Sequence, residues 1–268
     1  MKSLPRWLFV FLLILSVAQT LSAQQPPRPG SQVPQSYQSS KDAAQKLDYL
    51  LYLPDGYGET KTQWPLVIFL HGSGERGHDL TQVKKHGPPK VVETEGFPFI
   101  LVSPQCPSDV RWREEPVFPA LQGLLREIKQ RYSVDADRII LTGLSMGAQG
   151  TWFWASQDPI RFAAILPVCG KCEPEWGKKV AHLPTWVFHG AKDNVVPLSQ
   201  SEAIIAEMEA AGGKPKLTVY PDAMHDSWTE TYQNLVIYDW LLNHTRDDHL
   251  DLESAQSDQP LAAPKPVN

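Results

Sequence analysis

One serine, flanked by glycines, has the clearest potential for chemistry in this chain. Residues 143–147, GLSMG, form a G-x-S-x-G pentapeptide between an apolar run at 138–142 and a helical pattern at 146–156. In that context the serine occupies a tight strand-to-helix turn, and the glycines let the backbone pass without clashes. The helix N-terminus behind it favours negative charge. We therefore expect Ser145 to be a nucleophile in acyl transfer.

A serine hydroxyl needs a general base within hydrogen-bond reach, because it is a weak nucleophile at neutral pH. His225 lies in residues 221–226, PDAMHD, a short segment between the last predicted strand and the closing helix. This order, with the histidine last, is the one that a G-x-S-x-G turn predicts. The remaining histidines considered are placed less well, since they precede Ser145, end a strand or lie near the chain end: His71, His78, His86, His189, His244 and His249.

An acid should hold the base in the correct tautomer and stabilise its protonated form. Asp193 lies in residues 189–197, HGAKDNVVP, directly after the strand expected at 185–188. We expect Asp193 to fill this role. Asp222 and Asp226, which flank the histidine in sequence, are the alternatives.

A tetrahedral intermediate also requires hydrogen-bond donors for its negatively charged oxygen. The backbone N–H of Met146, next to the nucleophile, is one expected donor. The second is expected from the glycine-rich loop of residues 71–77, HGSGERG, where we choose the N–H of Ser73. A purely structural glycine-rich loop is the alternative.

Five further side chains could contact the substrate. Glu75 and Arg76 adjoin the glycine-rich loop, with a local ion pair between them as the alternative role. Aromatic side chains in an open cleft would suit aryl or carbohydrate-linked esters, such as feruloyl or acetyl esters. No long inserted lid is visible, which disfavours a triglyceride lipase. The other three candidates follow a predicted strand or the histidine: Gln105, Trp112 and Trp228.

Strand and helix patterns alternate along the chain, which predicts an α/β fold with a mostly parallel central sheet, helices on both faces and a single domain. Ligands of such sheets bind beyond the carboxyl ends of the strands. We expect strands at residues 47–53, 66–70, 99–103, 138–142, 163–168, 185–188 and 217–220, and helices at 119–132, 146–156, 199–211 and 229–243.

The two ends of the chain differ from its middle. Residues 1–23 combine Lys2 and Arg6 with an apolar run and small residues, which predicts a secretory signal peptide and a secreted or periplasmic protein; an uncleaved anchor is the alternative. Residues 24–45 are expected to be a flexible linker, residues 46–245 the catalytic domain and residues 246–268 a disordered tail.

The amino-acid composition disfavours some classes of binding partner. A formal net charge of -5 without a basic concentration disfavours nucleic acid as a partner. The chemistry outlined needs no metal or organic cofactor, and we expect none. Cys169 and Cys172 have the spacing of a redox motif, but we expect small buried residues or one local disulfide. Nothing in the sequence decides the oligomeric state.

Four segments together resemble a known group of proteins. HGSGERG, RIILTGLSMGAQGTW, HGAKDNVVP and YPDAMHDSW, in this order, resemble bacterial α/β-hydrolases described as predicted peptidases or esterases. These are similar to dienelactone hydrolases, to phospholipase/carboxylesterases and to prolyl oligopeptidase catalytic domains. The resemblance covers about residues 46–243 and implies the α/β-hydrolase fold, with Ser145, Asp193 and His225 as the triad and Ser73 and Met146 at the oxyanion positions.

Two departures from these families limit the expected activity. The nucleophile is serine, whereas dienelactone hydrolases proper use cysteine, and the chain lacks the β-propeller of true prolyl oligopeptidases. We expect a serine hydrolase that cleaves carboxylic esters through an acyl-enzyme. The alternatives are a serine peptidase with the same machinery and a catalytically silent binding protein, which would lack a triad member.

Overall fold

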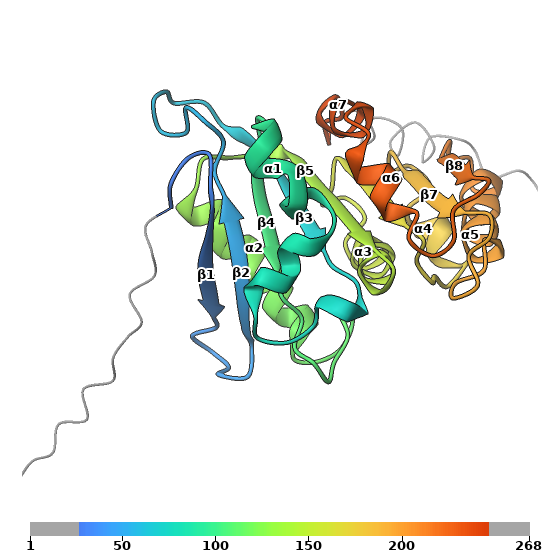
Figure 1. Ribbon diagram of the computed structural model, residues 1–268, viewed down its shortest axis with the longest axis horizontal. Helices are drawn as coiled ribbons and strands as arrows, with labels where there is room; N and C mark the ends of the chain where they lie inside the picture. Colours follow the sequence, from blue (N-terminus) through green and yellow to red (C-terminus); the bar gives the residue numbers. More distant parts are fainter. Residues whose placement is uncertain (1–26, 247–268) are drawn as a thin grey trace, which may run out of the picture.

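The computed structural model describes residues 27–246, which form one sheet of eight strands with helices packed on it (Figure 1). The signal peptide expected at residues 1–23 lies outside the described residues, as does the tail expected at residues 246–268 except for Arg246, which pairs with Asp137. The strands are β1 (Gln32–Gln38), β2 (Lys46–Tyr52), β3 (Trp64–Leu70), β4 (Ile100–Pro104), β5 (Val134–Leu144), β6 (Ala164–Val168), β7 (Trp186–Gly190) and β8 (Lys216–Tyr220). The helices are η1 (Ser73–Glu75), η2 (Leu80–Lys85), α1 (Pro88–Glu95), α2 (Val117–Arg131), α3 (Met146–Gln157), α4 (Trp176–Lys179), α5 (Ser199–Ala210), α6 (Trp228–Gln233) and α7 (Val236–Leu242).

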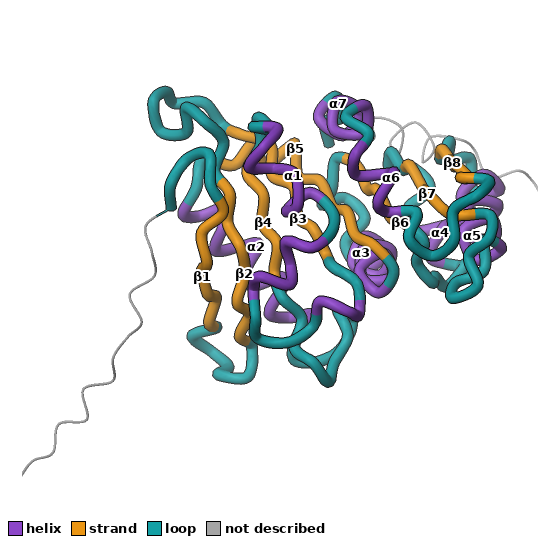
Figure 2. Tube along the Cα trace, viewed as in Figure 1, coloured by secondary structure: helices purple, strands orange, loops and turns teal. Residues whose placement is uncertain are grey.

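The sheet is mostly parallel, as the alternating pattern predicted. The strand order is β1-β2-β4-β3-β5-β6-β7-β8. β2 runs antiparallel to both of its neighbours, β1 and β4, whereas all other neighbouring pairs are parallel. The carboxyl ends of the parallel strands therefore meet at one edge of the sheet, where the loops after β3, β5, β6, β7 and β8 come together (Figure 2).

Two hydrophobic cores cover the two faces of the sheet, because successive side chains of a strand point to opposite faces. In β3, Leu66, Ile68 and Leu70 belong to the core beneath α2, α3 and α5, whereas Val67 and Phe69 belong to the core beneath α1, α6 and α7. Figure 1 shows α1 in front of the sheet and α2 behind it. Both faces of the central strands are therefore buried from solvent, which explains why these strands are continuous apolar runs.

One expectation from the sequence is wrong. Residues 24–45 were expected to be a flexible linker, but residues 32–38 form the edge strand β1, paired with β2 from Gln32 to Gln38. Val33 and Tyr37 are buried. The segment is rich in Gln, Ser and Pro, and its apolar residues alternate only weakly. Pro34 is tolerated because it lies on an edge strand. The folded domain therefore begins before residue 46.

The closing helix also differs from the expectation. The single helix expected over residues 229–243 is split into α6 and α7, because Asn234 adopts an extended conformation with φ −80° and ψ 106°. Its side-chain Oδ1 accepts the N–H of Val236 at the start of α7. The helix α1 was not expected, since it opens with Pro88 and Pro89. None of the helices within residues 27–246 has the length and apolarity that a membrane crossing requires.

Candidate active site

Ser145 lies at the sharp turn between β5 and α3, as the pentapeptide predicted. Its backbone has φ 52° and ψ −115°, a conformation that is uncommon for a residue with a side chain. The Ser145 N–H donates to the carbonyl oxygen of Val168 at 2.9 Å, which ties the turn to the end of β6. The hydroxyl is thus held at the carboxyl edge of the sheet by a strained backbone, an arrangement that commonly occurs at functional sites.

The side chains of Ser145, His225 and Asp193 form a continuous hydrogen-bonded series. Oγ of Ser145 lies 2.9 Å from Nε2 of His225, and Nδ1 of the same ring lies 2.7 Å from Oδ2 of Asp193. The carboxylate can only accept, so Nδ1 carries the proton and Nε2 is free to accept the serine hydroxyl proton. The structure therefore brings together the three residues expected from the sequence. The alternative acids do not reach the ring: Asp222 pairs instead with Lys192 at 2.6 Å.

Asp193 is buried and fully hydrogen-bonded. Its Oδ1 accepts the backbone N–H groups of Val195 and Val196, each at 2.9 Å, and its side chain is 0% exposed. Burial alone would raise the pKa of Asp193, but the hydrogen bonds from His225, Val196 and Val195 outweigh it, and the pKa lies below its usual value. The acid is therefore held ionised behind the ring.

His189 contacts Asp193, and this contact was not expected from the sequence. It is completely buried, and its Nε2 lies 3.3 Å from Oδ2 of Asp193 and 2.8 Å from the carbonyl oxygen of Val196. Its Nδ1 meets the hydroxyl of Ser201 at 2.8 Å. A histidine that ends a buried strand four positions before the acid was the available signal. It fixes the loop that carries Asp193.

A cleft of about 310 Å³ opens over the serine. Ser73 and Met146, the two expected oxyanion residues, both line it together with Ser145. Met146 is the first residue of α3, so its N–H has no partner within the helix and is available to a ligand. The complete set of lining residues is Ser73, Arg76, Arg111, Ser145, Met146, Gln149, Lys171, Val195 and Val196.

The charged side chains that line this cleft are all positive. Arg76, Arg111 and Lys171 line it, and no acidic residue does so within the described chain. The chain as a whole is acidic, with a formal net charge of -5, so this local excess of cations contrasts with the remaining surface. Negative charge that develops on a bound carbonyl oxygen would be favoured here. Neither Arg111 nor Lys171 was singled out from the sequence, because loops distant in the chain bring them together.

Glu75 and Arg76 do not form the ion pair considered from the sequence. Arg76 donates from Nε to the carbonyl oxygen of Ser73 at 3.1 Å and lines the cleft. Glu75 is buried and lies 4.0 Å from Nδ1 of His71 and 3.8 Å from Nε2 of His86. Arg76 therefore reaches the place expected of a substrate contact, whereas Glu75 lies within the loop.

Gln105 and Trp112 are buried and do not line the cleft. The Gln105 side chain donates to the carbonyl oxygens of Glu75 and Asp79 at 2.8 and 2.9 Å. The Trp112 indole donates to the carbonyl oxygen of His71 at 2.9 Å. Both hold the glycine-rich loop in place, which corrects the expectation that they contact substrate. The loop after β4 folds back over the sheet, so its polar groups bond to the neighbouring loop.

Trp228 lies where the sequence suggested an aromatic wall beside the base. Its ring meets the ring of His225 edge-on, with centroids 5.2 Å apart, and the ring of His86 at 5.5 Å. It does not line the cleft over Ser145. The indole therefore buttresses the imidazole and limits the positions that the ring can adopt.

Cys169 lies next to Asp193 and His225. Within residues 27–246, Cys169, Asp193 and His225 are the one group of three potential metal ligands, with ligand atoms within 4.8 Å of one another. These atoms are already engaged: the thiol donates to the backbone oxygen of His225 at 3.2 Å, and the other two residues bond to each other. Burial raises the pKa of the thiol to about 12, so a thiolate ligand is disfavoured. All three cysteines are free, and the local disulfide considered from the sequence is absent.

The sheet order and the strand-to-helix serine turn are those of the α/β-hydrolase fold, which the sequence segments predicted. Residues 108–239, just under half of the chain, match the sequence model of the dienelactone hydrolase family. That match runs from the loop before α2 into the first half of α7 and includes Ser145, Asp193 and His225.

Known proteins similar to this chain include esterases. A bifunctional acetylxylan esterase/xylanase from Neocallimastix patriciarum is 26% identical over 152 residues, which cover 53% of this chain and 21% of that protein. The crystal structure of a thermostable esterase matches this chain with a TM-score of 0.69 and 30% sequence identity. The match covers 80% of this chain and 63% of the esterase chain. The structure of a ferulic acid esterase from Anaeromyces mucronatus matches with a TM-score of 0.60 at 15% identity. This match covers 81% of this chain and 91% of the esterase chain, and it indicates the fold alone. The chain thus spans about a fifth of the curated relative.

Proposed function

We propose that this chain is a serine carboxylesterase in which Ser145 attacks the ester carbonyl. His225 takes the hydroxyl proton at Nε2 and returns it to the departing alcohol, which leaves an acyl-enzyme on Ser145. Water, activated by the same ring, then releases the acid and restores the serine. The observation that carries this proposal is the series of contacts of 2.9 Å from Ser145 to His225 and 2.7 Å from His225 to Asp193.

Each neighbouring group has a proposed role in stabilising charge. Asp193 fixes the tautomer of His225 and stabilises its protonated form during turnover. The backbone N–H groups of Ser73 and Met146 receive the carbonyl oxygen as it becomes negative, a contribution worth about 10²–10³ in rate for each such donor. Arg76 and Lys171 at the rim of the cleft add positive potential near that oxygen.

We propose small aryl or carbohydrate-linked esters, such as feruloyl or acetyl esters, as the substrates. The cleft is open and lined by loops and by the start of α3, and no inserted helical lid covers it within residues 27–246. The names of two similar proteins, an acetylxylan esterase and a ferulic acid esterase, favour the same class. We also propose that residues 1–23 direct export, which would give the enzyme access to extracellular polymers.

Two measurements test the proposal together. A fluorophosphonate probe should label the unaltered chain at Ser145 and leave the Ser145→Ala protein unlabelled. A panel of p-nitrophenyl acyl esters, feruloyl esters, acetylated xylan and peptides should give turnover on the esters. Absence of any adduct would favour a silent binding protein, and turnover confined to peptides would favour the serine peptidase. Activity confined to long acyl chains would overturn the substrate class.

A further inference from the structure

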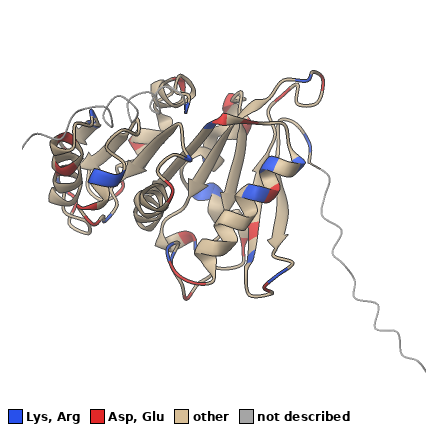
Figure 3. Ribbon diagram, turned by 180° about the vertical axis from the view of Figure 1, so that it is seen from behind, with Lys and Arg blue, Asp and Glu red and all other residues tan. Residues whose placement is uncertain are grey.

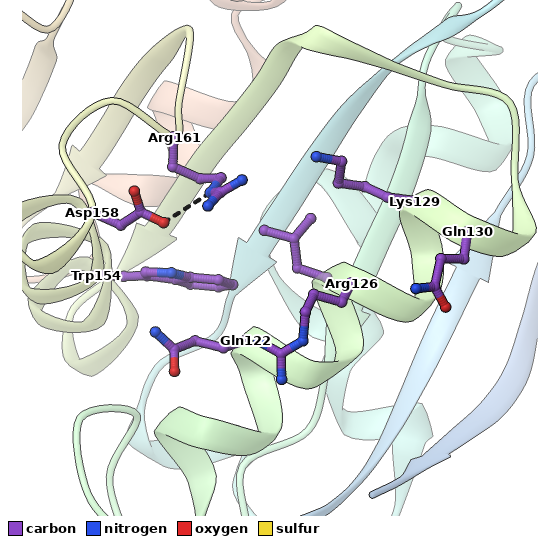
Figure 4. A pocket seen from close by; sticks show the side chains of 8 residues that line it. Gln122, Arg126, Lys129, Gln130, Trp154, Asp158 and Arg161 are labelled. Atoms are coloured by element: carbon purple, nitrogen blue, oxygen red, sulfur yellow. Dashed lines mark hydrogen bonds and ion pairs between the residues drawn. The ribbon is translucent and has the colours of Figure 1, made fainter.

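A second cavity, larger than the cleft over Ser145, lies between α2 and the end of α3. Its volume is about 420 Å³, within the range of small-molecule sites. Residues of α2 form one wall, whereas Trp154, Asp158 and Arg161 form the other (Figure 4). The complete set of lining residues is Gln122, Leu125, Arg126, Lys129, Gln130, Trp154, Asp158 and Arg161.

The cavity is distinct from the proposed active site. α3 begins beside Ser145 and ends at Gln157, so its 12 residues place the cavity about 18 Å further along the helix axis. No residue lines both the cavity and the cleft. A ligand bound at the end of α3 would therefore not contact the reacting atoms.

Positive charge dominates this cavity. Arg126, Lys129 and Arg161 line it, against the single acid Asp158. Arg161 bonds to Asp158 through Nε at 2.8 Å, which leaves its terminal nitrogens for another partner. Figure 4 shows the ends of Arg161 and Lys129 directed toward the same space. On this face of the molecule, basic positions follow one another along the helix in front of the sheet (Figure 3).

Neither Arg126 nor Lys129 makes a hydrogen bond or ion pair with any residue from 27 to 246. Asp137, the other acid near Lys129, is bound by Arg246 at 2.8 Å. Burial lowers the pKa of Lys129, and the positive charges of Arg161 and Arg246 lower it further. Lys129 and Arg161 are therefore held near one another without full neutralisation, an arrangement that an anion would stabilise.

The cavity also offers uncharged hydrogen-bonding groups. Gln122 and Gln130 project from α2 on the same wall as the cations, and neither amide has a partner within the described chain. An amide both donates and accepts, which suits hydroxyl groups. The buried indole of Trp154 and the side chain of Leu125 supply an apolar floor. Cations, amides and an apolar surface in one cavity match an anion carried on a hydroxylated ring.

We infer that the cavity between α2 and the end of α3 is a binding site for a sugar acid, with the carboxylate held by Lys129 and Arg161 and the hydroxyl groups by Gln122 and Arg126. This inference does not depend on the proposed esterase activity. It gives the molecule a second site on the face opposite to α1, through which it could hold a carboxylated carbohydrate independently of catalysis.

Calorimetric titration of the full chain with D-glucuronate at low salt tests the inference. Glucuronate should bind, D-glucose should not, and inorganic sulfate should bind at least tenfold more weakly than glucuronate because it lacks the ring hydroxyls. The double variant Arg126→Gln/Lys129→Gln should lose at least tenfold in affinity. Arg131→Gln, which removes a charge from the same helix outside the cavity, is the matched control and should bind normally.

Three results would overturn the inference: no binding of glucuronate, equal affinity for sulfate, or unchanged affinity in the double variant. The melting temperature of each variant checks that it is folded. Saturating glucuronate should leave the hydrolysis of p-nitrophenyl acetate unchanged, because the cavity is separate from the cleft. Competitive inhibition would instead locate the anion at the cations around Ser145 and would also overturn the inference.

Discussion

Gly147 in the first turn of α3 lies directly against the carbonyl oxygen of Leu70 at the end of β3. A Cβ atom added at Gly147 would overlap that oxygen, and its neighbours there are backbone atoms, which cannot move aside as a flexible side chain could. The close approach seats the nucleophile turn against the strand that leads into the glycine-rich loop. The contact therefore fixes the position of the nucleophile turn relative to the glycine-rich loop.

We expect Gly147→Ala to destabilise the fold by about 3 kcal/mol and to abolish turnover, because the helix must shift away from β3. Gly74→Ala is the matched control, since a Cβ at Gly74 meets nothing within 4 Å. Its free energy of unfolding should change by less than about 1 kcal/mol. Urea denaturation of both variants measures the difference. Equal stability of the two would contradict the close packing at Gly147.

Substitutions in the hydrogen-bonded series should differ in severity. Ser145→Ala and His225→Ala should each lower kcat by about 10⁶-fold with the fold intact, whereas Asp193→Asn should cost about 10⁴-fold, because its role is orientation. Steady-state kinetics on p-nitrophenyl acetate measure all three. Full activity of Asp193→Asn would exclude it as the acid, and Asp222 or Asp226 would become the candidate.

His71 should make the stability of the fold depend on pH. Its Nε2 accepts the N–H of Cys106 at 3.0 Å, so the ring is neutral, and burial lowers its pKa to about 4. In the unfolded chain the ring titrates near 6.5, so between these values the unfolded state binds more protons. Stability should therefore be complete above about pH 6.5 and should fall by about 3 kcal/mol as the pH falls to about 4.

The His71→Asn variant isolates this contribution, because carboxylates also titrate in the acidic range. It should be less stable near neutral pH, yet its stability should fall less steeply on acidification. Urea denaturation of both proteins at several pH values gives the two slopes. Parallel slopes would mean that His71 is not the titrating group.

The three cysteines should be unreactive in the folded protein. Cys106, Cys169 and Cys172 are buried and free, and burial raises the pKa of each thiol to about 12. Ellman's reagent should therefore modify none of them before unfolding and all of them in denaturant, and dithiothreitol should leave activity unchanged. Rapid modification of the native protein would contradict the burial of these thiols.

The centre of the fold could be predicted because its signals are local. The apolar runs of β3 and β5 and the glycines around Ser145 identify strands and the turn from adjacent residues alone. The order of Ser145, Asp193 and His225 then sufficed to select three side chains that lie within hydrogen-bond distance of one another. Their catalytic roles stay predictions.

The remaining features depend on contacts between distant segments. β1 is polar and contains Pro34, so only its pairing with β2 identifies it as a strand. Gln105 and Trp112 follow a strand end, as substrate contacts do, but they bond to the neighbouring loop. The cations Arg111 and Lys171 converge only when separate loops have folded. No local pattern contains that information.

The place of β1 at the rim of the sheet sets a limit on how far the amino end can be trimmed. The pairing begins at Gln32, and a further bridge joins Pro29 to Leu53. Proteolysis beyond this point would strip β2 of its partner and leave a row of bare amide and carbonyl groups, which invites association with other chains. Shortened versions of the protein made for crystallisation should therefore start upstream of Pro29.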